Sequence, residues 1–294
     1  MFMENKIPKI AVHDGGFHTD DVFAVAILSL IYSKYKILRT RDIDKLRSAD
    51  LRVDVGRNYN PKTGDFDHHQ KEFIKTRKNK IPYASAGLIW LSFGEKLVNS
   101  KEAFDYIDKK IMQPIDAHDN GINLCKEEIV PYSIQNIIST FSPKWDLENP
   151  DYNSSFNKAV SFAKKILIEE IGIANSLKKE KELVKKTVEE TNNEYIVFEK
   201  IPPCYREILV KYPKIKYVVS KSVSGNWNSE ACRIMENSFE TIKPFPKEWA
   251  DLVNERLAKI TNVKDAVFCH RGLFIAVAKS KEGAIRLTEL ALDN

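Results

Sequence analysis

Cysteine is scarce and scattered in this sequence. Four cysteines occur among 294 residues, at positions 125, 204, 232 and 269, and no two of them form a Cys-x-x-Cys pair. Disulfide scaffolds and zinc ribbons both depend on closely spaced, paired cysteines. We therefore expect neither, and we expect the protein to occupy a reducing compartment.

Glycine-rich nucleotide-binding loops are also missing. The 11 glycines form no Gly-x-x-x-x-Gly-Lys-Ser/Thr loop, and no Gly-x-Gly-x-x-Gly follows a predicted strand. Such loops cradle phosphates in nucleotide-driven and dinucleotide-dependent enzymes. The sequence contains no local motif for a serine or cysteine nucleophile either. These absences argue against redox chemistry, nucleotide-driven transfer and nucleophilic serine or cysteine schemes.

Long apolar runs are absent as well. Nowhere do 18 apolar residues follow one another, so no segment is expected to span a membrane. The first six residues lack the apolar stretch of a secretory signal, which makes the cytoplasm the default expectation, with an organelle or the nucleus left open. The net charge of +5 is weakly basic and is compatible with phosphate-bearing partners.

The pattern of strands and helices predicts an α/β protein with two domains. A length of 294 residues exceeds one typical domain. Short apolar strands over 7–12, 37–40 and 50–56 alternate with helices, which is typical of mainly parallel sheets. We expect an N-terminal domain over 1–150, a long linker helix over 151–190 and a smaller C-terminal α/β domain over 191–294. Ser85 is expected to cap a helix, and 245–260 to form an amphipathic helix.

The metal-capable side chains gather before residue 120, in segments predicted to be loops or element ends. They are His13, His18, Asp20, Asp54, Asp67, His68, His69, Asp116 and Asp119, with Asp21 next to Asp20. Open α/β sheets keep their sites at the carboxyl ends of strands, where His13 and Asp54 are expected. The stretch 64–70 is predicted to be a loop, and the segment 115–121 places its acids just before a turn-forming Asn-Gly at 120–121. Imidazole and carboxylate together suit Mn, Fe, Co or Zn ions.

Each of these clusters also has a simpler explanation. Asp20 and Asp21 are favourable in the first turn of a helix. Asp54 can cap a turn, 67–69 can be a solvated turn, and 116–121 can be an Asx-type turn. So many carboxylates in one crevice would, however, repel one another without cations. Two divalent ions bridged by Asp54, about 3.5–4 Å apart, would neutralise them and could clamp the oxygens of a phosphoryl transfer. The sequence therefore predicts metal-dependent hydrolysis.

Seven short motifs, distributed from one end of the chain to the other, carry a family resemblance. They are His-x4-His-Thr-Asp-Asp over 13–21, Arg-Thr-Arg-Asp over 39–42, Val-Asp-Val-Gly over 53–56 with Tyr-Asn-Pro over 59–61, Asp-His-His-Gln over 67–70, Ser-Ala-Gly-Leu-Ile over 85–89, Asp-Ala-His-Asp-Asn-Gly-Ile over 116–122 and Lys-Glu-Gly-Ala over 281–284. With these motifs the chain resembles the melanocyte-proliferating-gene family. That family is a branch of the DHH phosphoesterase superfamily, which includes RecJ-like nucleases and family II pyrophosphatases.

The resemblance implies a DHH-type N-terminal domain that binds two divalent ions, with Mn²⁺ favoured and Mg²⁺, Co²⁺ or Zn²⁺ as alternatives. It implies that His13 or His18 acts with Asp20 in the first motif, that Asp54 bridges the ions, and that His68 is a ligand. Asp119, or alternatively Asp116, would close the second ion site. His69 would face the scissile phosphate, and it forms the expected catalytic group with Asp67 and Asp21.

For function, the resemblance implies a 3′–5′ exonuclease that removes nucleotides from RNA, so RNA or an oligonucleotide is the expected partner; a homodimer is left open. The chain departs from related proteins in the C-terminal domain, where it lacks a Gly-Gly-His, so His270, Arg271 and Lys279 are the expected substrate-binding residues. Two alternatives stand beside this expectation. One is a phosphatase or pyrophosphatase for a small phosphorylated molecule or a short oligonucleotide, and the other is a non-catalytic binding protein on the same fold.

Overall fold

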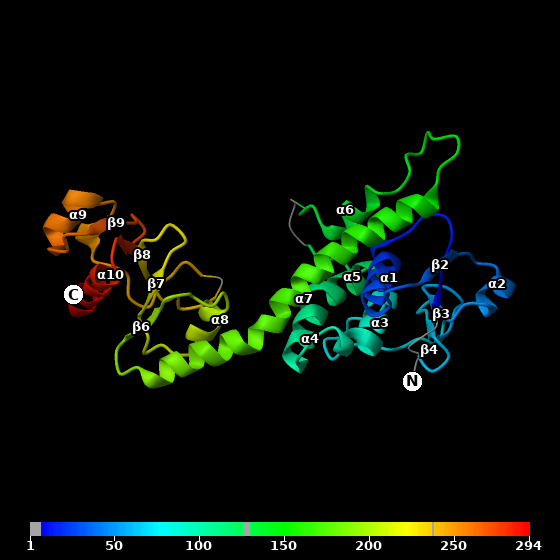
Figure 1. The fold of residues 1–294 in the computed structure, drawn as a ribbon, viewed down its shortest axis with the longest axis horizontal. Helices are drawn as coiled ribbons and strands as arrows, with labels where there is room; N and C mark the ends of the chain where they lie inside the picture. Colours follow the sequence, from blue (N-terminus) through cyan, green and yellow to red (C-terminus); the bar gives the residue numbers. More distant parts are fainter. Residues whose placement is uncertain (1–6, 126–129, 237) are drawn as a thin grey trace. The chain divides into compact units, whose positions relative to one another are not determined.

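The computed structural model describes residues 7–125, 130–236 and 238–294 (Figure 1). Residues 1–6, for which no secretory signal is predicted, lie outside this description. The chain separates into two compact units, Met1–Ser176 and Leu177–Asn294. The boundary falls inside one continuous helix, α7 (Tyr152–Glu190), which confirms the long helix predicted over 151–190. Among the described helices, none is long and apolar enough to cross a membrane.

The first unit is built on a five-stranded sheet that is parallel except at one edge. Its strands are β1 (Lys9–Val12), β2 (Lys36–Arg39), β3 (Leu51–Val53), β4 (Tyr59–Asn60) and β5 (Asp65–Phe66), in the order β2-β1-β3-β5-β4. Only β4 runs antiparallel to its neighbour. The stretch 64–70 is therefore not entirely a loop as predicted, because its residues 65 and 66 pair with β3 and β4.

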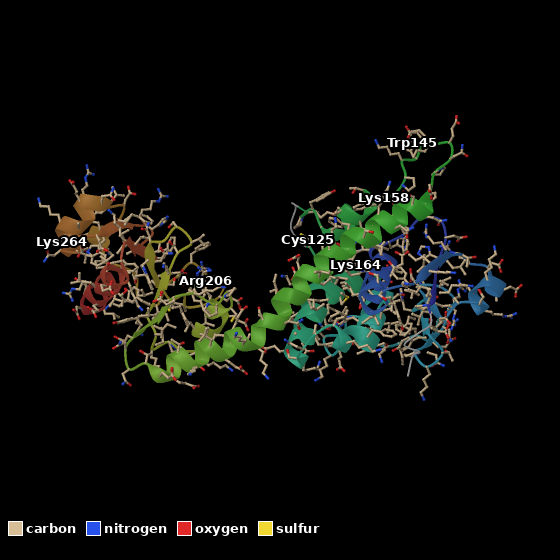
Figure 2. The ribbon with its side chains drawn as sticks, viewed as in Figure 1. Cys125, Trp145, Lys158, Lys164, Arg206 and Lys264 are labelled. Carbon is tan, nitrogen blue, oxygen red and sulfur yellow. The ribbon has the colours of Figure 1, made fainter. Side chains whose placement is uncertain are left out.

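Helices pack on this sheet and bury its apolar strands. They are α1 (Thr19–Ile31), α2 (Ile43–Arg47), α3 (Ser85–Phe93), α4 (Lys101–Ile107), α5 (Gln113–Asp119) and α6 (Ile134–Ser139), with a π-helical segment over Asp108–Met112. Helix α1 packs against α3, and its residues from Thr19 to Ser29 are all buried. The first half of α7 joins the same core through Phe156, Ala163 and Leu167. Lys164 of α7 donates a hydrogen bond to the carbonyl of Ser29 (2.9 Å; Figure 2).

The turn predicted at Asn120 and Gly121 is confirmed, but Asp116, which was predicted to lie in a loop or at an element end, does not lie there. Helix α5 continues to Asp119, so Asp116 lies inside a helix. Pro114 at the start of α5 is compatible with this, because the first helical turn needs no amide donor there. The turn follows only at Asn120 and Gly121, and the latter has a φ of +73°.

The second unit contains another five-stranded sheet, which is mixed. Its elements are β6 (Tyr195–Phe198), α8 (Tyr205–Leu209), β7 (Tyr217–Lys221), β8 (Trp227–Ala231), a 3₁₀ turn (Lys247–Trp249), α9 (Asn254–Thr261), β9 (Ala266–Cys269), β10 (Ile275–Ala278) and α10 (Lys281–Asp293), with the strand order β6-β7-β8-β10-β9. Helix α10 packs on the sheet. The α/β architecture is thus confirmed. The helix predicted over 245–260 is wrong, because Asp251 and Asn254 adopt positive φ values (61° and 46°) that interrupt it.

Candidate metal centre

Three adjacent parallel strands deliver the central residues of the candidate site. His13 directly follows β1, Asp54 follows β3, and the 67–69 stretch follows β5. Because the carboxyl ends of parallel strands meet at one edge of a sheet, these side chains converge there. Asp54 has a φ of 56°, and its amide donates to the carbonyl of Phe66 (3.1 Å). This contact ties the end of β3 to the end of β5.

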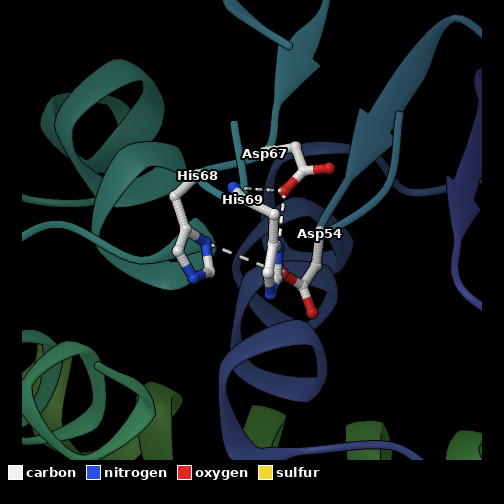
Figure 3. A group of neighbouring side chains, drawn as sticks. All are labelled: Asp54, Asp67, His68 and His69. Atoms are coloured by element: carbon white, nitrogen blue, oxygen red, sulfur yellow. Dashed lines mark hydrogen bonds and ion pairs between the residues drawn. The ribbon is translucent and has the colours of Figure 1, made fainter. Parts of the chain in front are cut away.

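The carboxylate of Asp54 lies between histidines on two sides. Its Oδ2 is 3.4 Å from Nε2 of His13, while its Oδ1 is 3.7 Å from Nδ1 of His68 and 3.4 Å from Nδ1 of His69. Figure 3 shows how Asp54, Asp67, His68 and His69 point toward one another. One carboxylate therefore presents each of its oxygens to a different imidazole group.

Three groups of side chains offer ligand atoms that lie within 4.8 Å of one another. The groups are His13, His18 and Asp54; Asp20, His68 and Asp119; and Asp54, Asp67, His68 and His69. Each group mixes imidazole nitrogen with carboxylate oxygen, which suits divalent transition-metal ions. Both histidines of the first motif, His13 and His18, share a group with Asp54. The first two groups have no residue in common, and they can hold two separate ions.

The acids of this region repel one another in the absence of a cation. Burial raises the pKa of Asp20 well above its ordinary value, and the neighbouring carboxylates of Asp54 and Asp119 raise it further. Burial also raises the pKa of Asp54, but hydrogen bonding to His13 and the charge of His68 bring it below its usual range. A bound cation would remove the repulsion that Asp20 experiences. The residues present therefore fit a divalent metal ion.

His13 is held in a suitable orientation for a ligand. Its Nδ1 is 3.2 Å from the carbonyl of Asp14, and its Nε2 is 3.1 Å from Oδ2 of Asp21. Burial lowers the pKa of His13, but hydrogen bonds with Asp21 and Asp54 outweigh it and raise the pKa to about 10. A ring that donates from Nδ1 to a backbone carbonyl presents the lone pair of Nε2 to a metal. Asp21 also accepts the amide of His18 (2.9 Å), which positions that residue.

Helix α3 holds Asp20 by its first two backbone amides. The amide of Ser85 donates to Oδ2 of Asp20 (2.9 Å), and the amide of Ala86 donates to Oδ1 (2.6 Å). The predicted cap is therefore wrong, because Ser85 is the first residue of the helix and Ala84 precedes it without a capping side chain. Asp20, 65 residues away in the chain, satisfies the free amides instead.

Ser85 is a site residue whose contacts the sequence does not indicate. Its Oγ donates to Oδ1 of Asp54 (3.2 Å) and lies 3.3 Å from Nδ1 of His68. A serine at the start of a helix is so common as a cap that its spacing alone could not assign it to the site.

Asp116 lies apart from the three groups. Its Oδ2 is 2.7 Å from Nη1 of Arg77, and its Oδ1 accepts the amide of Gly87 (3.0 Å). Burial raises the pKa of Asp116 to about 7, against the opposing effect of Arg77. Asp119 instead places its Oδ2 3.0 Å from Nε2 of His68. Of the two acids left open by the sequence, the structure brings Asp119 to the candidate centre.

Gly87 allows the buried pair of Asp116 and Arg77 to approach α3, and Gly87→Ala tests this. A Cβ at Gly87 would meet Oδ2 of Asp116 at 1.9 Å and Nη2 of Arg77 at 2.7 Å. We expect the free energy of unfolding to fall by about 1–3 kcal/mol, as in other overpacked interiors. Urea unfolding followed by circular dichroism measures it.

The matched control for this variant is Gly172→Ala in α7, where a Cβ would meet nothing within 4 Å. Both glycines belong to the first unit, so both variants report on the same unfolding transition. The control should be more stable than the parent by about 0.5–1 kcal/mol, because alanine favours a helix. Equal effects of the two substitutions would contradict the role of Gly87.

Asp67 holds His69 and the turn before β4. Its Oδ1 accepts the amide of His69 (3.0 Å) and lies 2.8 Å from Nδ1 of the same residue, and its Oδ2 accepts the amide of Arg57 (2.6 Å). The hydrogen bond with Asp67 raises the pKa of His69, although burial opposes it. The side chain of His69 is 54% exposed, so its ring reaches open space.

Two cavities adjoin the candidate centre. One, of about 460 Å³, extends toward Arg41 and Arg57, and the other, of about 360 Å³, extends toward α5 and α6. His18 and His69 line both of them. A substrate can therefore reach His69 from either cavity.

The predicted substrate-binding residues of the C-terminal domain belong to the second unit. His270 and Arg271 lie between β9 and β10, where Nδ1 of His270 accepts the amide of Gly272 (2.9 Å). Lys279 follows β10, and its amide donates to the carbonyl of Asp265 (3.0 Å). Their role in binding substrate stays a prediction.

Residues 9–292, nearly the whole chain, match the MYG1_exonuc family model, described as an uncharacterised protein family (UPF0160). The chain belongs to the MYG1 family. It is 28% identical over 323 residues to the MYG1 exonuclease of Mus musculus, covering 97% of this chain and 85% of the relative. The MYG1 exonuclease of Homo sapiens is also 28% identical, with coverage of 97% and 86%. The MYG1 protein of Chlamydia muridarum is 29% identical over 302 residues, with 98% of both chains covered.

Proposed function

We propose that this member of the MYG1 family is a DHH-type phosphodiester hydrolase that depends on two divalent metal ions and removes nucleotides from the 3′ end of RNA. The observation that carries the proposal is the position of Asp54, whose two carboxylate oxygens face different imidazoles. Two relatives, from mouse and human, bear the name exonuclease, which supports the same class of reaction.

The residues would form two ion sites. His13, His18 and Asp54 would hold one ion, and Asp20, His68 and Asp119 would hold the other; Asp54, which shares a further group with His68, would bridge the two. Bound ions supply hydroxide near neutral pH and neutralise the charge on phosphate oxygens.

Around these ligands, neighbouring residues position the reacting groups. The carbonyl of Asp14 orients the ring of His13 through Nδ1, Asp21 positions the amide of His18, and Ser85 orients Asp54 and His68 through its hydroxyl. Asp67 keeps a proton on His69 by pairing with Nδ1, so that Nε2 can donate to a non-bridging phosphate oxygen.

Metal-dependent turnover tests the proposal. Protein stripped with a chelator and reloaded with Mn²⁺, Mg²⁺, Co²⁺ or Zn²⁺ is assayed against RNA and DNA labelled at either end, a dinucleotide and pyrophosphate. We expect Mn²⁺-dependent release of mononucleotides from the 3′ end of RNA. Turnover that persists in the chelated protein would contradict the metal mechanism. Turnover of pyrophosphate alone would replace the polymer with a small phosphorylated substrate.

A further inference from the structure

The cavity of about 460 Å³ beside the candidate centre differs in character from its neighbour. Its lining includes two arginines, Arg41 and Arg57, together with the aliphatic residues Ile43 and Leu46. The neighbouring cavity is lined by Phe17, by the acids Asp20 and Asp119, and by residues of α5 and α6, with no lysine or arginine among its described lining residues. Its size lies within the range of small-ligand pockets, roughly 300–1,000 Å³.

Arg57 is held at the rim by its backbone and has a free guanidinium. Gly56 and Arg57 adopt consecutive positive φ values (100° and 51°), and the amide of Arg57 donates to Oδ2 of Asp67. A non-glycine residue in this conformation persists only where its surroundings fix it. Within the described part of the chain, no acidic side chain forms an ion pair with Arg57, so its N–H donors can bind an anion.

Arg41 is fixed by one edge of its guanidinium only. Its Nη1 is 2.6 Å from Oδ1 of Asp14 and 2.5 Å from the carbonyl of Asp14. Since a guanidinium has five N–H donors in a planar fork, the remaining donors can point to a second acceptor. Asp14 directly follows His13, so the backbone that positions a candidate ligand also positions Arg41.

Ile43 adds an apolar surface to the two cations. Its side chain is 68% exposed at the start of α2, whereas Leu46 below it is buried. Two arginines suit a phosphate, and an exposed aliphatic side chain suits the face of a nucleobase. A nucleotide carries both groups, since its ribose joins a phosphate to a base with a flat face.

We propose that this cavity is a binding site for a nucleoside monophosphate, with Arg41 and Arg57 at the phosphate and Ile43 against the base. The inference rests on the proposed function, because the nucleotide bound there is the terminal residue of the substrate and the released product. Binding of the free nucleotide does not, however, require hydrolysis, so it can be measured separately.

Calorimetric titration of Mn²⁺-loaded protein with 5′-AMP, 3′-AMP, adenosine and inorganic phosphate tests the inference. Arg57→Ala and Arg41→Ala should each weaken binding of the preferred AMP isomer by about tenfold or more, the scale of a lost hydrogen bond to a charged group. Ile43→Ser should weaken binding of AMP and leave phosphate binding unchanged. Arg47→Ala is the matched control. Arg47 lies on α2, the helix that begins at Ile43, and it pairs with Asp44 outside the cavity.

Unchanged AMP affinity in both arginine variants would overturn the inference, as would a parent protein that binds neither AMP isomer. Circular dichroism and metal content establish that each variant is folded and loaded. If AMP binds through the arginines but no oligonucleotide is hydrolysed, the nucleotide site stands and the proposed function fails. If oligonucleotides are hydrolysed but the affinity for AMP does not depend on the arginines, the proposed function stands and the proposed nucleotide site is wrong.

Discussion

Asp54→Ala is expected to abolish hydrolysis and to reduce metal binding at both ion sites. The reason is that the two oxygens of Asp54 face His13 on one side and His68 on the other. If Asp54 bridges the two ions as proposed, its loss would remove one ligand from each site and the negative charge between the ions. Metal content by mass spectrometry, measured beside single-turnover rates, reports both effects. A variant that keeps two ions per chain would show that Asp54 does not bridge them.

The effect of losing the carboxylate must be distinguished from an effect on the backbone, because Asp54 has a φ of 56°. Alanine is disfavoured in this left-handed region, whereas asparagine enters it readily. Asp54→Asn is therefore the better variant for chemistry: it should unfold like the parent and still lose activity and metal. If Asp54→Asn were active while Asp54→Ala were not, the backbone and not the carboxylate charge would explain the loss.

His69→Ala should lower the catalytic rate by roughly a hundredfold or more while both ions stay bound. His69 is half exposed, paired to Asp67 and located where the two cavities meet. A donor that acts on developing charge contributes mainly to the transition state, and the loss of one such donor has this magnitude. Single-turnover rates and metal content of the same preparation measure the two properties together.

The alternative role for His69 is that of a metal ligand. His69 shares a group of possible ligands with Asp54, Asp67 and His68. If His69→Ala loses metal as completely as Asp54→Ala, His69 is a ligand and the assigned donor role is wrong. His69→Gln provides a further comparison, because it keeps an N–H donor and should recover part of the rate.

Local sequence signals predicted the strands and the first helix of the site well. Apolar runs mark the strands that end just before His13 and Asp54. Acidic first-turn residues mark the start of the helix just before Asp20. The two-residue strand β5 has no such signal, since it exists only through pairing with β3 and β4.

Contacts between distant segments could not be predicted in the same way. The ion pair of Asp116 with Arg77 joins a helix to a loop 39 positions away, a distance in sequence that no periodicity covers. The helix over 245–260 fails for a related reason: its apolar spacing is real, but Phe245 and Trp249 stack in the core (5.9 Å between ring centroids) ahead of the break at Asp251. Tertiary packing overrides the local preference there.

The contact of Asp20 with the start of α3 has a consequence for mutational tolerance. Backbone amides, not side chains, hold both oxygens of Asp20. Any residue small enough for these two buried positions, 85 and 86, would supply the same donors and keep the anchor of Asp20; proline, which has no amide hydrogen, is the exception. The hydrogen bond from the hydroxyl of Ser85 to Asp54, in contrast, depends on the side chain and would be lost on substitution. At residue 85 the contact with Asp20 therefore does not select the side chain, whereas Asp54, His68 and the buried position of the residue do.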